Sequence, residues 1–322
     1  MKQEQKAYQV VGRVSSMRPD EWLAIRKKSI GGSEIAAAVG LSRWKTPFQL
    51  FAEKTGLVKP DNKQTEAMYW GSVLEAVIRE EFTKRTGYKV TKPDFIFAAA
   101  GYPFLTANLD GIIDFGNGEY GVLEIKTANG YSESDWADDG CPVEYFLQVQ
   151  HYLYVTGLKR GYIAVLIGGS NFRLIEIQRD DNVIQKIEGL AVDFWTNHVM
   201  TGKAPAVMSD DISALNMLYP QSRPKSAVVL TEDFNGVVAE YNLAKSQMDE
   251  AKKRKEAAEV KLKEAMKDNE EAVVGAFKLT WKTTKRTTLS AEKVKALLTP
   301  DMVEECTVTS TSRMFRVSKI KK

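Results

Sequence analysis

The pattern of apolar and polar positions predicts helices and short strands that alternate over roughly the first two hundred residues. Apolar positions three and four apart indicate helices, and short runs of β-branched and aromatic residues indicate strands. The helices are expected at residues 20–26, 34–39, 46–56, 65–85 and 143–156. The strands are expected at residues 95–97, 109–115, 120–126, 162–167 and 173–177. Helices on both sides of a short mixed central sheet make an α/β core of residues 10–208.

A β-hairpin is predicted in the middle of this core. The turn residues 116–118 (Gly-Asn-Gly) join the two strands before and after them. Because side chains alternate faces along a strand, Glu124 and Lys126 share one face of the sheet. A three-residue loop at 116–118 pairs residues whose numbers sum to 234, which puts Asp110 directly opposite Glu124. The hairpin therefore gathers two carboxylates and a lysine on one face.

This group of side chains predicts a metal site. Two facing carboxylates a few Å apart repel each other unless a cation lies between them, and hard oxygen ligands with positions left for water suit Mg²⁺, for which Mn²⁺ substitutes. A lysine beside such a metal orients or deprotonates a water, and the site can then hydrolyse phosphodiesters. Glu124 lies in an apolar run, where a buried carboxylate needs a partner. Taken alone, the three residues also fit charges on the solvated face of a hairpin.

Three further motifs hold candidate site residues. Glu75 is a further metal ligand or a glutamate on a helix surface, and Gln148 is a site residue or a packing glutamine. Arg26 and the segment 31–33 (Gly-Gly-Ser) form an anion site, because backbone N–H groups at a helix start and a guanidinium both bind anions. The alternative for that segment is a plain turn with Ser33 as an N-cap.

Composition narrows the class of protein only mildly. The chain has 322 residues, and 43% hydrophobic with 27% charged residues is typical of a soluble globular protein. The polar N-terminus lacks the apolar segment of a signal peptide, and no apolar run reaches membrane-spanning length. Two cysteines far apart, Cys141 and Cys306, favour a reduced cytosolic protein, and two histidines argue against a histidine-built zinc site.

A separate extension is predicted after the core. Residues 209–228 contain two prolines and suit a linker. Residues 229–322 are expected to form a long helix at about 235–267 plus a β-hairpin, in the order helix, strand, helix, strand, with strands around Phe277 and Phe315. Residues 225–322 hold 20 Lys and Arg against 15 Asp and Glu. From Val273 to the end there are 11 Lys and Arg against 4 Asp and Glu, so contact between this last part and the DNA backbone is a hypothesis.

Taken together, the ordered motifs resemble the YqaJ and lambda-exonuclease family of phage nucleases, which belong to the restriction-endonuclease-like PD-(D/E)xK group. The resemblance covers about residues 10–205. It rests on five motifs: Arg26…Gly31-Gly32-Ser33, Trp70-Gly71…Leu74-Glu75, Leu109-Asp110-Gly111, Leu123-Glu124-Ile125-Lys126 and Gln148-Val149-Gln150-x-Tyr152. The chain departs from the family pattern at Leu109, where many relatives have a proline before the catalytic aspartate.

The resemblance implies a Mg²⁺-dependent exonuclease of phage or prophage recombination. Such an enzyme digests one strand of linear double-stranded DNA from its 5′ end and leaves a 3′ single strand for annealing. The resemblance also implies a restriction-endonuclease-like core, a ring-shaped trimer around the duplex, a single-strand annealing protein as partner, and a cytoplasmic location in the bacterial host.

By the same resemblance, each motif residue takes a role in the site. Asp110, Glu124 and the backbone carbonyl of Ile125 are the metal ligands, and Glu75 binds the metal or positions a metal-bound water. Lys126 orients or activates the nucleophile, and Gln148 steadies the site. Arg26 and Ser33 bind the 5′-phosphate.

Two other functions stay open. One is a structure-selective DNA endonuclease on the same fold, which would cut closed circles as fast as linear duplex. The other is a non-catalytic DNA-binding module of recombination that has kept the fold and lost turnover. The presence of all five motifs argues against the second.

Overall fold

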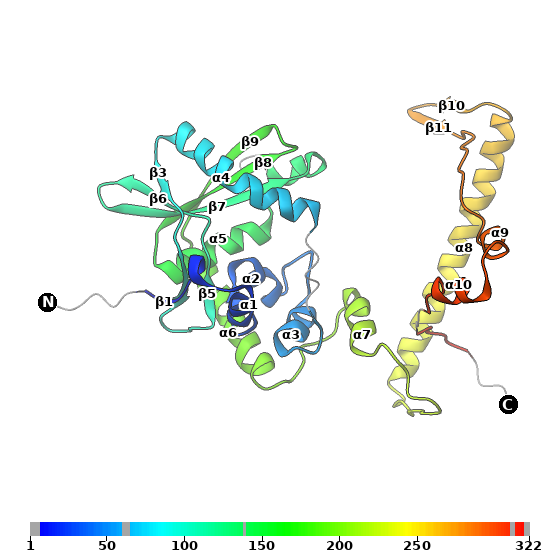
Figure 1. Cartoon of the computed structure of the whole chain (residues 1–322), viewed down its shortest axis with the longest axis horizontal. Coiled ribbons are helices and arrows are strands. Elements are labelled where there is room, and N and C mark those ends of the chain that lie inside the picture. The colour runs from blue at the N-terminus through cyan, green and yellow to red at the C-terminus, as the bar shows by residue number, and fades with distance from the viewer. Residues whose placement is uncertain (1–6, 60–64, 138–139, 310–312, 319–322) are drawn as a thin grey trace. The chain divides into compact units, whose positions relative to one another are not determined.

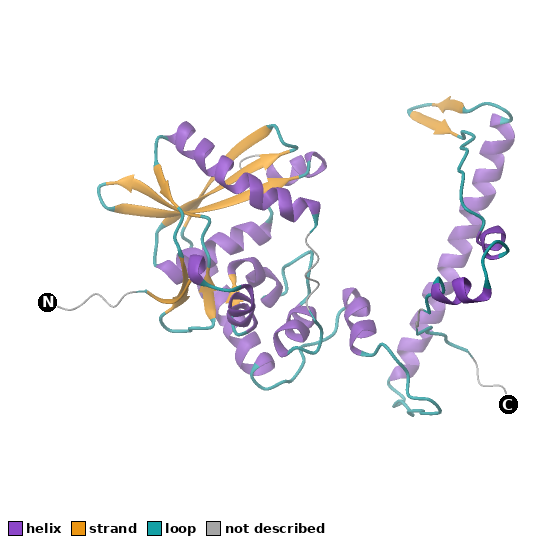
Figure 2. Ribbon diagram, in the orientation of Figure 1, coloured by secondary structure: helices purple, strands orange, loops and turns teal. Residues whose placement is uncertain are grey.

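The computed structural model describes residues 7–59, 65–137, 140–309 and 313–318. It divides into two compact units, Met1–Leu218 and Tyr219–Lys322. Figure 1 shows the order of the elements along the chain, and Figure 2 shows their type. The first unit contains both large sheets, and the second consists of a long helix with shorter elements after it.

A five-stranded sheet forms the centre of the first unit. Its strands lie in the order β3 (Lys89–Thr91), β6 (Gly111–Gly116), β7 (Glu119–Ala128), β8 (Arg160–Ile167) and β9 (Asn171–Gln178). The pair β7 and β8 is parallel, and the other neighbours are antiparallel. The sheet is therefore mixed, as predicted.

Helices cover both faces of this sheet (Figure 2). Helix α5 (Val143–Thr156) connects the parallel strands β7 and β8, because a parallel pair needs a crossover that a tight turn cannot supply. It buries Val149 against Val122 on one face. Helix α4 (Glu66–Thr86) buries Phe82 against Leu123 on the other face. Helices on both faces of a mixed sheet confirm the predicted α/β class.

The alternation along β7 decides which side chains reach the site. Leu123 and Ile125 pack on the side of α4, whereas Val122 packs in the cluster on the side of α5. Because neighbouring side chains point to opposite faces, Glu124 and Lys126 lie on the α5 side with Val122. Both therefore face the helix that carries Gln148.

The predicted geometry of the hairpin is correct, but its turn is different. Gly111 pairs with Leu123, so the register follows the predicted sum, and one further step puts Asp110 across from Glu124. Gly116 pairs with Glu119, which leaves a two-residue turn with positive φ at Asn117 and Gly118. A register shift between Asp114 and Gly116 adds one residue to that strand. This bulge preserves the parity that the three-residue loop was expected to provide.

The first unit contains a second sheet of four strands, and only one of them, the strand at Phe95–Ala99, was predicted from the sequence. Its order is β1 (Tyr8–Arg13), β4 (Phe95–Ala99), β5 (Leu105–Ala107) and β2 (Ile30–Gly31). Four α-helices of the described residues lie along the chain between β1 and β3 of the five-stranded sheet: α1 (Pro19–Lys27), α2 (Gly32–Ala38), α3 (Pro47–Thr55) and α4. Sequence periodicity cannot reveal strands as short as β2 and β5, which form only because partners far along the chain are in place. The six-residue strand β1 was also missed.

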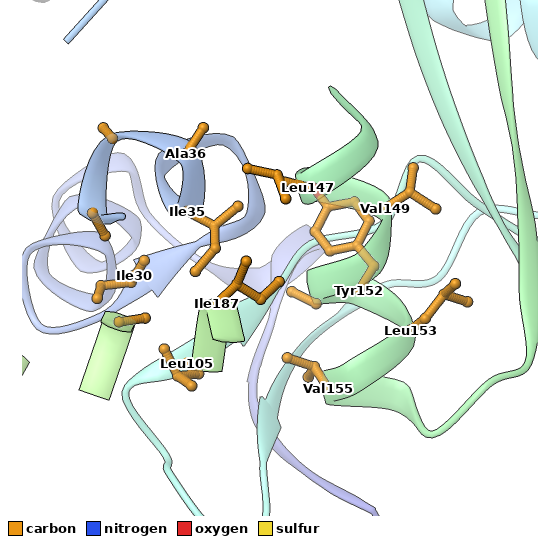
Figure 3. Close-up of a cluster of buried hydrophobic side chains, with 14 of the residues drawn as sticks. Ile30, Ile35, Ala36, Leu105, Leu147, Val149, Tyr152, Leu153, Val155 and Ile187 are labelled. Atoms are coloured by element: carbon orange, nitrogen blue, oxygen red, sulfur yellow. The ribbon is translucent and has the colours of Figure 1, made fainter. Parts of the chain in front are cut away.

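Helix α2 packs closely against α5. Figure 3 shows Ile35 and Ala36 of α2 beside Leu147 and Tyr152 of α5, in one cluster of buried apolar side chains. A Cβ atom on Gly32 would lie 2.2 Å from Cε1 of Tyr152, so only glycine allows the two helices to approach this closely. The contact fixes the start of α2 relative to the helix that carries Gln148.

The first part of the predicted linker at 209–228 belongs to the first unit instead. After α6 (Asp181–Asp193) and a π-helical turn (Phe194–Val199), a 3₁₀ turn (Ser209–Asp211) leads into α7 (Ile212–Leu218). Asp211 is fully buried, accepts from the hydroxyl of Thr46, and accepts from the backbone N–H of Met208 at 2.7 Å. A polar composition suggested a linker, but the aspartate satisfies backbone and hydroxyl donors inside the unit.

The second unit begins with the predicted long helix, α8 (Phe234–Met266). It continues with the hairpin strands β10 (Glu271–Val274) and β11 (Phe277–Thr280), then α9 (Ala291–Lys295) and α10 (Pro300–Glu305). The strand predicted around Phe315 is wrong: that segment is not in a sheet, and Phe315 packs edge-to-face on Tyr241 of α8 at 5.6 Å. None of the described helices is both long and apolar enough to cross a membrane.

A buried histidine in α5 makes the stability of the fold depend on pH. His151 is 1% exposed, and its Nε2 lies 2.9 Å from the carbonyl oxygen of Thr106. Burial lowers the pKa of His151 to about 4, below the ordinary 6.5. Between these two pH values His151 is protonated in the unfolded chain but neutral in the folded chain. The free energy of unfolding therefore decreases as the pH falls from 6.5 to 4.

We expect this histidine to account for up to about 3 kcal/mol of acid destabilisation. His151→Gln keeps an N–H donor but does not titrate, so its free energy of unfolding should fall less steeply below pH 6.5. Urea unfolding of both proteins at pH 7.5, 6, 5 and 4.5 measures the difference. If the free energy of unfolding fell equally with pH in the two proteins, protonation of His151 would not be coupled to stability.

Candidate active site

A cavity of about 510 Å³ opens where strand β7, helices α4 and α5, and the start of α2 meet. Every site residue predicted from the sequence lines it: Arg26, Ser33, Glu75, Asp110, Glu124, Ile125, Lys126 and Gln148. These residues come from six separate stretches of the chain. The fold therefore brings together all of the residues that the motifs singled out.

Glu124 is the most deeply buried of the charged groups in this cavity, at 2% exposure. Its Oε1 atom lies 2.5 Å from Nζ of Lys126 and accepts from Nε2 of Gln148 at 2.7 Å. Its Oε2 atom is buried and has no hydrogen-bond partner among the described residues. A buried carboxylate oxygen without a partner is costly, so this atom needs a cation or a donor beyond those that the described residues provide.

Asp110 lies just before β6, and its Oδ2 atom accepts from the backbone N–H of Ile125 at 2.9 Å. This bond ties Asp110 to the strand that carries Glu124. Leu109, directly before Asp110, is buried in the main core and anchors the residue that follows it. The two carboxylates line the same cavity, as the predicted register requires.

The pKa values of Asp110 and Glu124 are both raised, and a bound cation would stabilise the two carboxylates in their charged form. Burial, and then the nearby charge of Asp110, raise the pKa of Glu124 to about 8. Burial also raises the pKa of Asp110, although the N–H of Ile125 and the charge of Lys126 oppose this. Burial alone would lower the pKa of Lys126, but the carboxylates of Glu124 and Asp110 outweigh it and raise that pKa. The two acids are thus held close together in a low-dielectric place.

Both the nitrogen and the oxygen of the Gln148 side-chain amide make hydrogen bonds inside the site. Its Nε2 donates to Glu124 and, at 2.9 Å, to the hydroxyl of Tyr152, while its Oε1 accepts from Lys126 Nζ at 3.1 Å. The second glutamine of the motif, Gln150, instead donates to the backbone carbonyl of Gln178 at the end of β9 and accepts from the backbone N–H of Asp180. The first glutamine therefore belongs to the site and the second to the fold.

Glu75 reaches the cavity from α4 but is already paired with cations. It contacts Arg79, and Lys92 Nζ lies 2.6 Å from its Oε1. Arg79 also donates from Nε to the backbone carbonyl of Asp110 at 3.0 Å. Arg79 was missed in the sequence because it is an ordinary helix arginine there. Its place four residues after Glu75 was the available signal.

Arg26 and Ser33 line the same cavity from two other elements, α1 and α2. Arg26, near the end of α1, stacks on Trp22 at 4.8 Å from the ring centre and donates to Glu34 Oε1 at 3.1 Å. Ser33 is exposed at the beginning of α2. Glu34 was not singled out from the sequence, where it reads as a helix glutamate.

The donor set fits a hard divalent cation. The described residues contain no group of three or more His, Cys, Asp or Glu side chains that could hold a metal. The cavity is lined by two carboxylates that could hold a cation, those of Asp110 and Glu124, and by Ile125, whose backbone carbonyl is the third predicted ligand. Mg²⁺ usually binds through one or two carboxylates and keeps several waters, so an incomplete set of this kind suits it. The partnerless Oε2 of Glu124 is the observation that favours this fit.

Comparisons with known proteins agree with the motifs. Residues 21–159 match the YqaJ-like viral recombinase domain. The uncharacterised protein YqaJ of Bacillus subtilis (strain 168) is 36% identical over 319 residues, which is 98% of this chain and 99% of that protein. Protein D345L of African swine fever virus (strain Badajoz 1971 Vero-adapted) is 38% identical over 63 residues, which is 20% of this chain and 18% of that protein.

Among solved structures, an alkaline exonuclease (LHK-Exo) from Laribacter hongkongensis is similar with a TM-score of 0.49. It is 22% identical and is matched over 57% of this chain and 94% of its own. The likeness to the Bacillus protein runs over nearly the whole of both chains, and the matched domain contains all five motifs. The chain belongs to the YqaJ-like viral recombinase family.

Proposed function

We propose that this protein is a Mg²⁺-dependent exonuclease of phage or prophage recombination, acting on linear double-stranded DNA. In this proposal it digests one strand from the 5′ end and leaves a 3′ single strand for annealing, and Mn²⁺ substitutes for Mg²⁺. The observation that carries the proposal is the buried Oε2 of Glu124, which lacks a partner in a cavity shared with Asp110 and Lys126. Membership of a viral recombinase family supports a role on DNA.

Each residue of the cavity has a distinct task in this reaction. Asp110, Glu124 and the carbonyl of Ile125 hold the divalent cation. When bound, that cation supplies charge stabilisation for the phosphate and a lowered pKa for a coordinated water. Lys126, held between Glu124 and Gln148, orients or activates the attacking water.

Gln148 and Glu75 act on the positions of other groups. Gln148 fixes the orientation of Glu124 and Lys126 by bonding to both. Glu75 is paired with Arg79 and Lys92, so we assign it the positioning of a metal-bound water rather than direct coordination. Arg79 joins Glu75 to the backbone at Asp110 and links the two.

The remaining part of the proposal concerns the DNA end and the assembly. The guanidinium of Arg26 and the hydroxyl of Ser33 line the same cavity as the acids and would bind a terminal 5′-phosphate. From family membership we further propose a trimer that encircles duplex DNA. By the same inference the protein works with a single-strand annealing protein in the bacterial cytoplasm.

Divalent cations should stabilise the protein through this site. At about 100 times its Kd, Mg²⁺ should raise the Tm of the first unit by roughly 5–10 °C, because it binds the folded chain only. Asp110→Asn should remove most of this shift. Glu176→Gln, which changes a carboxylate on β9 that does not line the cavity, is the matched control and should keep it. An equal shift in all three proteins would mean that the cation binds elsewhere.

Digestion of DNA tests the reaction itself. Linear duplex with 5′-phosphate should lose nucleotides in Mg²⁺, linear duplex with 5′-hydroxyl should be digested more slowly, and closed circles should stay intact. Glu124→Gln and Lys126→Met should each lower the rate by at least about a hundredfold without changing the far-UV circular dichroism. Glu133→Gln, whose carboxylate pairs with Arg173 outside the cavity, should digest DNA like the wild type.

Two results of this assay would contradict the proposal in different ways. Closed circles cut as fast as linear 5′-phosphate duplex would indicate a structure-selective endonuclease on the same fold. No release of nucleotides from any DNA, in Mg²⁺ or Mn²⁺, would indicate a non-catalytic DNA-binding module.

A further inference from the structure

A second group of buried charges lies behind Arg26, outside the acidic pair. Glu34 is only 8% exposed, and both of its oxygens are used. Oε1 accepts from Arg26 at 3.1 Å, and Oε2 accepts from Lys54 Nζ at 2.7 Å and from the backbone N–H of Gly31 at 3.1 Å. Lys54 Nζ also donates to the backbone carbonyl of Arg26 at 2.6 Å. One carboxylate thus joins the end of α1, the segment before α2, and α3.

The carboxylate in this group is ionised at neutral pH. Burial alone would raise the pKa of Glu34, but the charges of Lys54 and Arg26 outweigh it, and its pKa lies below the ordinary value. A buried ion pair of this kind is weak evidence for stability, because an apolar pair of similar volume often stabilises a fold as well. The ion pair also holds other groups in place, because Glu34 contacts both Arg26 and the backbone at Gly31.

What it holds is an arginine that borders two cavities. Arg26 lines the candidate active site and also a neighbouring cavity of about 970 Å³, lined by Lys27, Lys45 and Glu53 among others. Its side chain is 41% exposed, so packing alone does not fix the guanidinium on one side. Trp22 supports one face of the guanidinium, and Glu34 accepts from one edge. The donors that remain are those available to a ligand.

We propose that Glu34 is a positioning residue for DNA ends: it aims Arg26 at the terminal 5′-phosphate, with Lys54 as its buried counter-charge. The inference rests on the proposed function and names the part of the site that selects a phosphorylated end. The backbone N–H of Gly31 also donates to Glu34, so the same carboxylate contacts both Arg26 and the segment that precedes Ser33.

An electrostatic role and a positioning role of Glu34 predict opposite effects of Glu34→Gln on phosphate binding. Arg26, Glu34 and Lys54 together carry a net charge of +1. Glu34→Gln raises it to +2, so a purely electrostatic role predicts tighter binding of a phosphate. A positioning role predicts weaker binding, because the guanidinium loses the charged acceptor that orients it. The sign of the effect therefore separates the two roles.

The test is the preference of the full-length protein for 5′-phosphate over 5′-hydroxyl ends on otherwise identical linear duplexes. In Glu34→Gln the ratio of kcat/KM for the two ends should fall about tenfold, the equivalent of one charge-assisted hydrogen bond. The loss should appear as a higher KM for the phosphorylated end. The kcat on 5′-hydroxyl ends should stay within about twofold of the wild type, because the acidic pair is untouched.

A second variant covers the case in which Glu34→Gln leaves Lys54 buried without a partner and fails to fold. Glu34→Met/Lys54→Met removes both charges at similar volume and keeps the net charge at +1. It should show the same loss of preference. Glu53→Gln is the matched control: it changes a carboxylate of α3 that pairs with Lys45 at 2.6 Å, and it should keep the preference.

The outcomes separate this inference from the proposed function. A wild-type preference that persists or increases in Glu34→Gln or in the double variant overturns the inference and leaves the exonuclease intact. A wild-type protein that digests DNA without any preference for 5′-phosphate ends overturns the inference together with the proposed phosphate pocket. A preference lost in both Glu34 variants and kept in Glu53→Gln supports it.

Discussion

The site depends on one costly interaction, the burial of the Glu124 carboxylate in the middle of β7. One oxygen is bound by Lys126 and Gln148, while the other has no partner among the described residues, and Asp110 adds a second negative charge nearby. A fold does not keep such an arrangement for stability, because an unpaired buried polar atom destabilises it. The surrounding elements are best understood as the structure that holds this carboxylate where a cation can reach it.

The fold provides that support through the parallel pair β7 and β8 and the helix that joins them. The crossover brings α5 onto the face of β7 that carries Glu124 and Lys126, and Gln148 then contacts both residues. Leu123 and Ile125 point to the other face and pack under α4. Strand alternation thus places the acids on one side of the strand and the apolar residues that fix it on the other.

Much of this could be predicted from the sequence because the signals are local. Helix α5 has the predicted bounds, and α3 and α4 begin after the capping residues Thr46 and Thr65. The parity of the hairpin was also correct, although it arises from a bulge and a two-residue turn. Both solutions keep the two acids in register, and the sequence of the turn alone does not distinguish them.

The parts that were missed depend on contacts far along the chain. The two-residue strand β2 exists only because β5, more than seventy residues later, lies beside it. Glu34 and Lys54 are twenty residues apart on separate helices, and no periodic pattern connects them. Asp211 was assigned to a linker because the segment 209–228 is polar in composition. Its hydrogen-bond partner Thr46 lies 165 residues away, which no local pattern reveals.

The central claim is that the carboxylates of Asp110 and Glu124 hold a divalent cation. Anomalous diffraction from crystals soaked in Mn²⁺ tests it most directly, because the signal locates the ion without reference to activity. We expect a peak between the two carboxylates and the carbonyl of Ile125, absent in crystals of Asp110→Asn. A cavity that stays free of Mn²⁺, or a peak that persists unchanged in that variant, would contradict the claim.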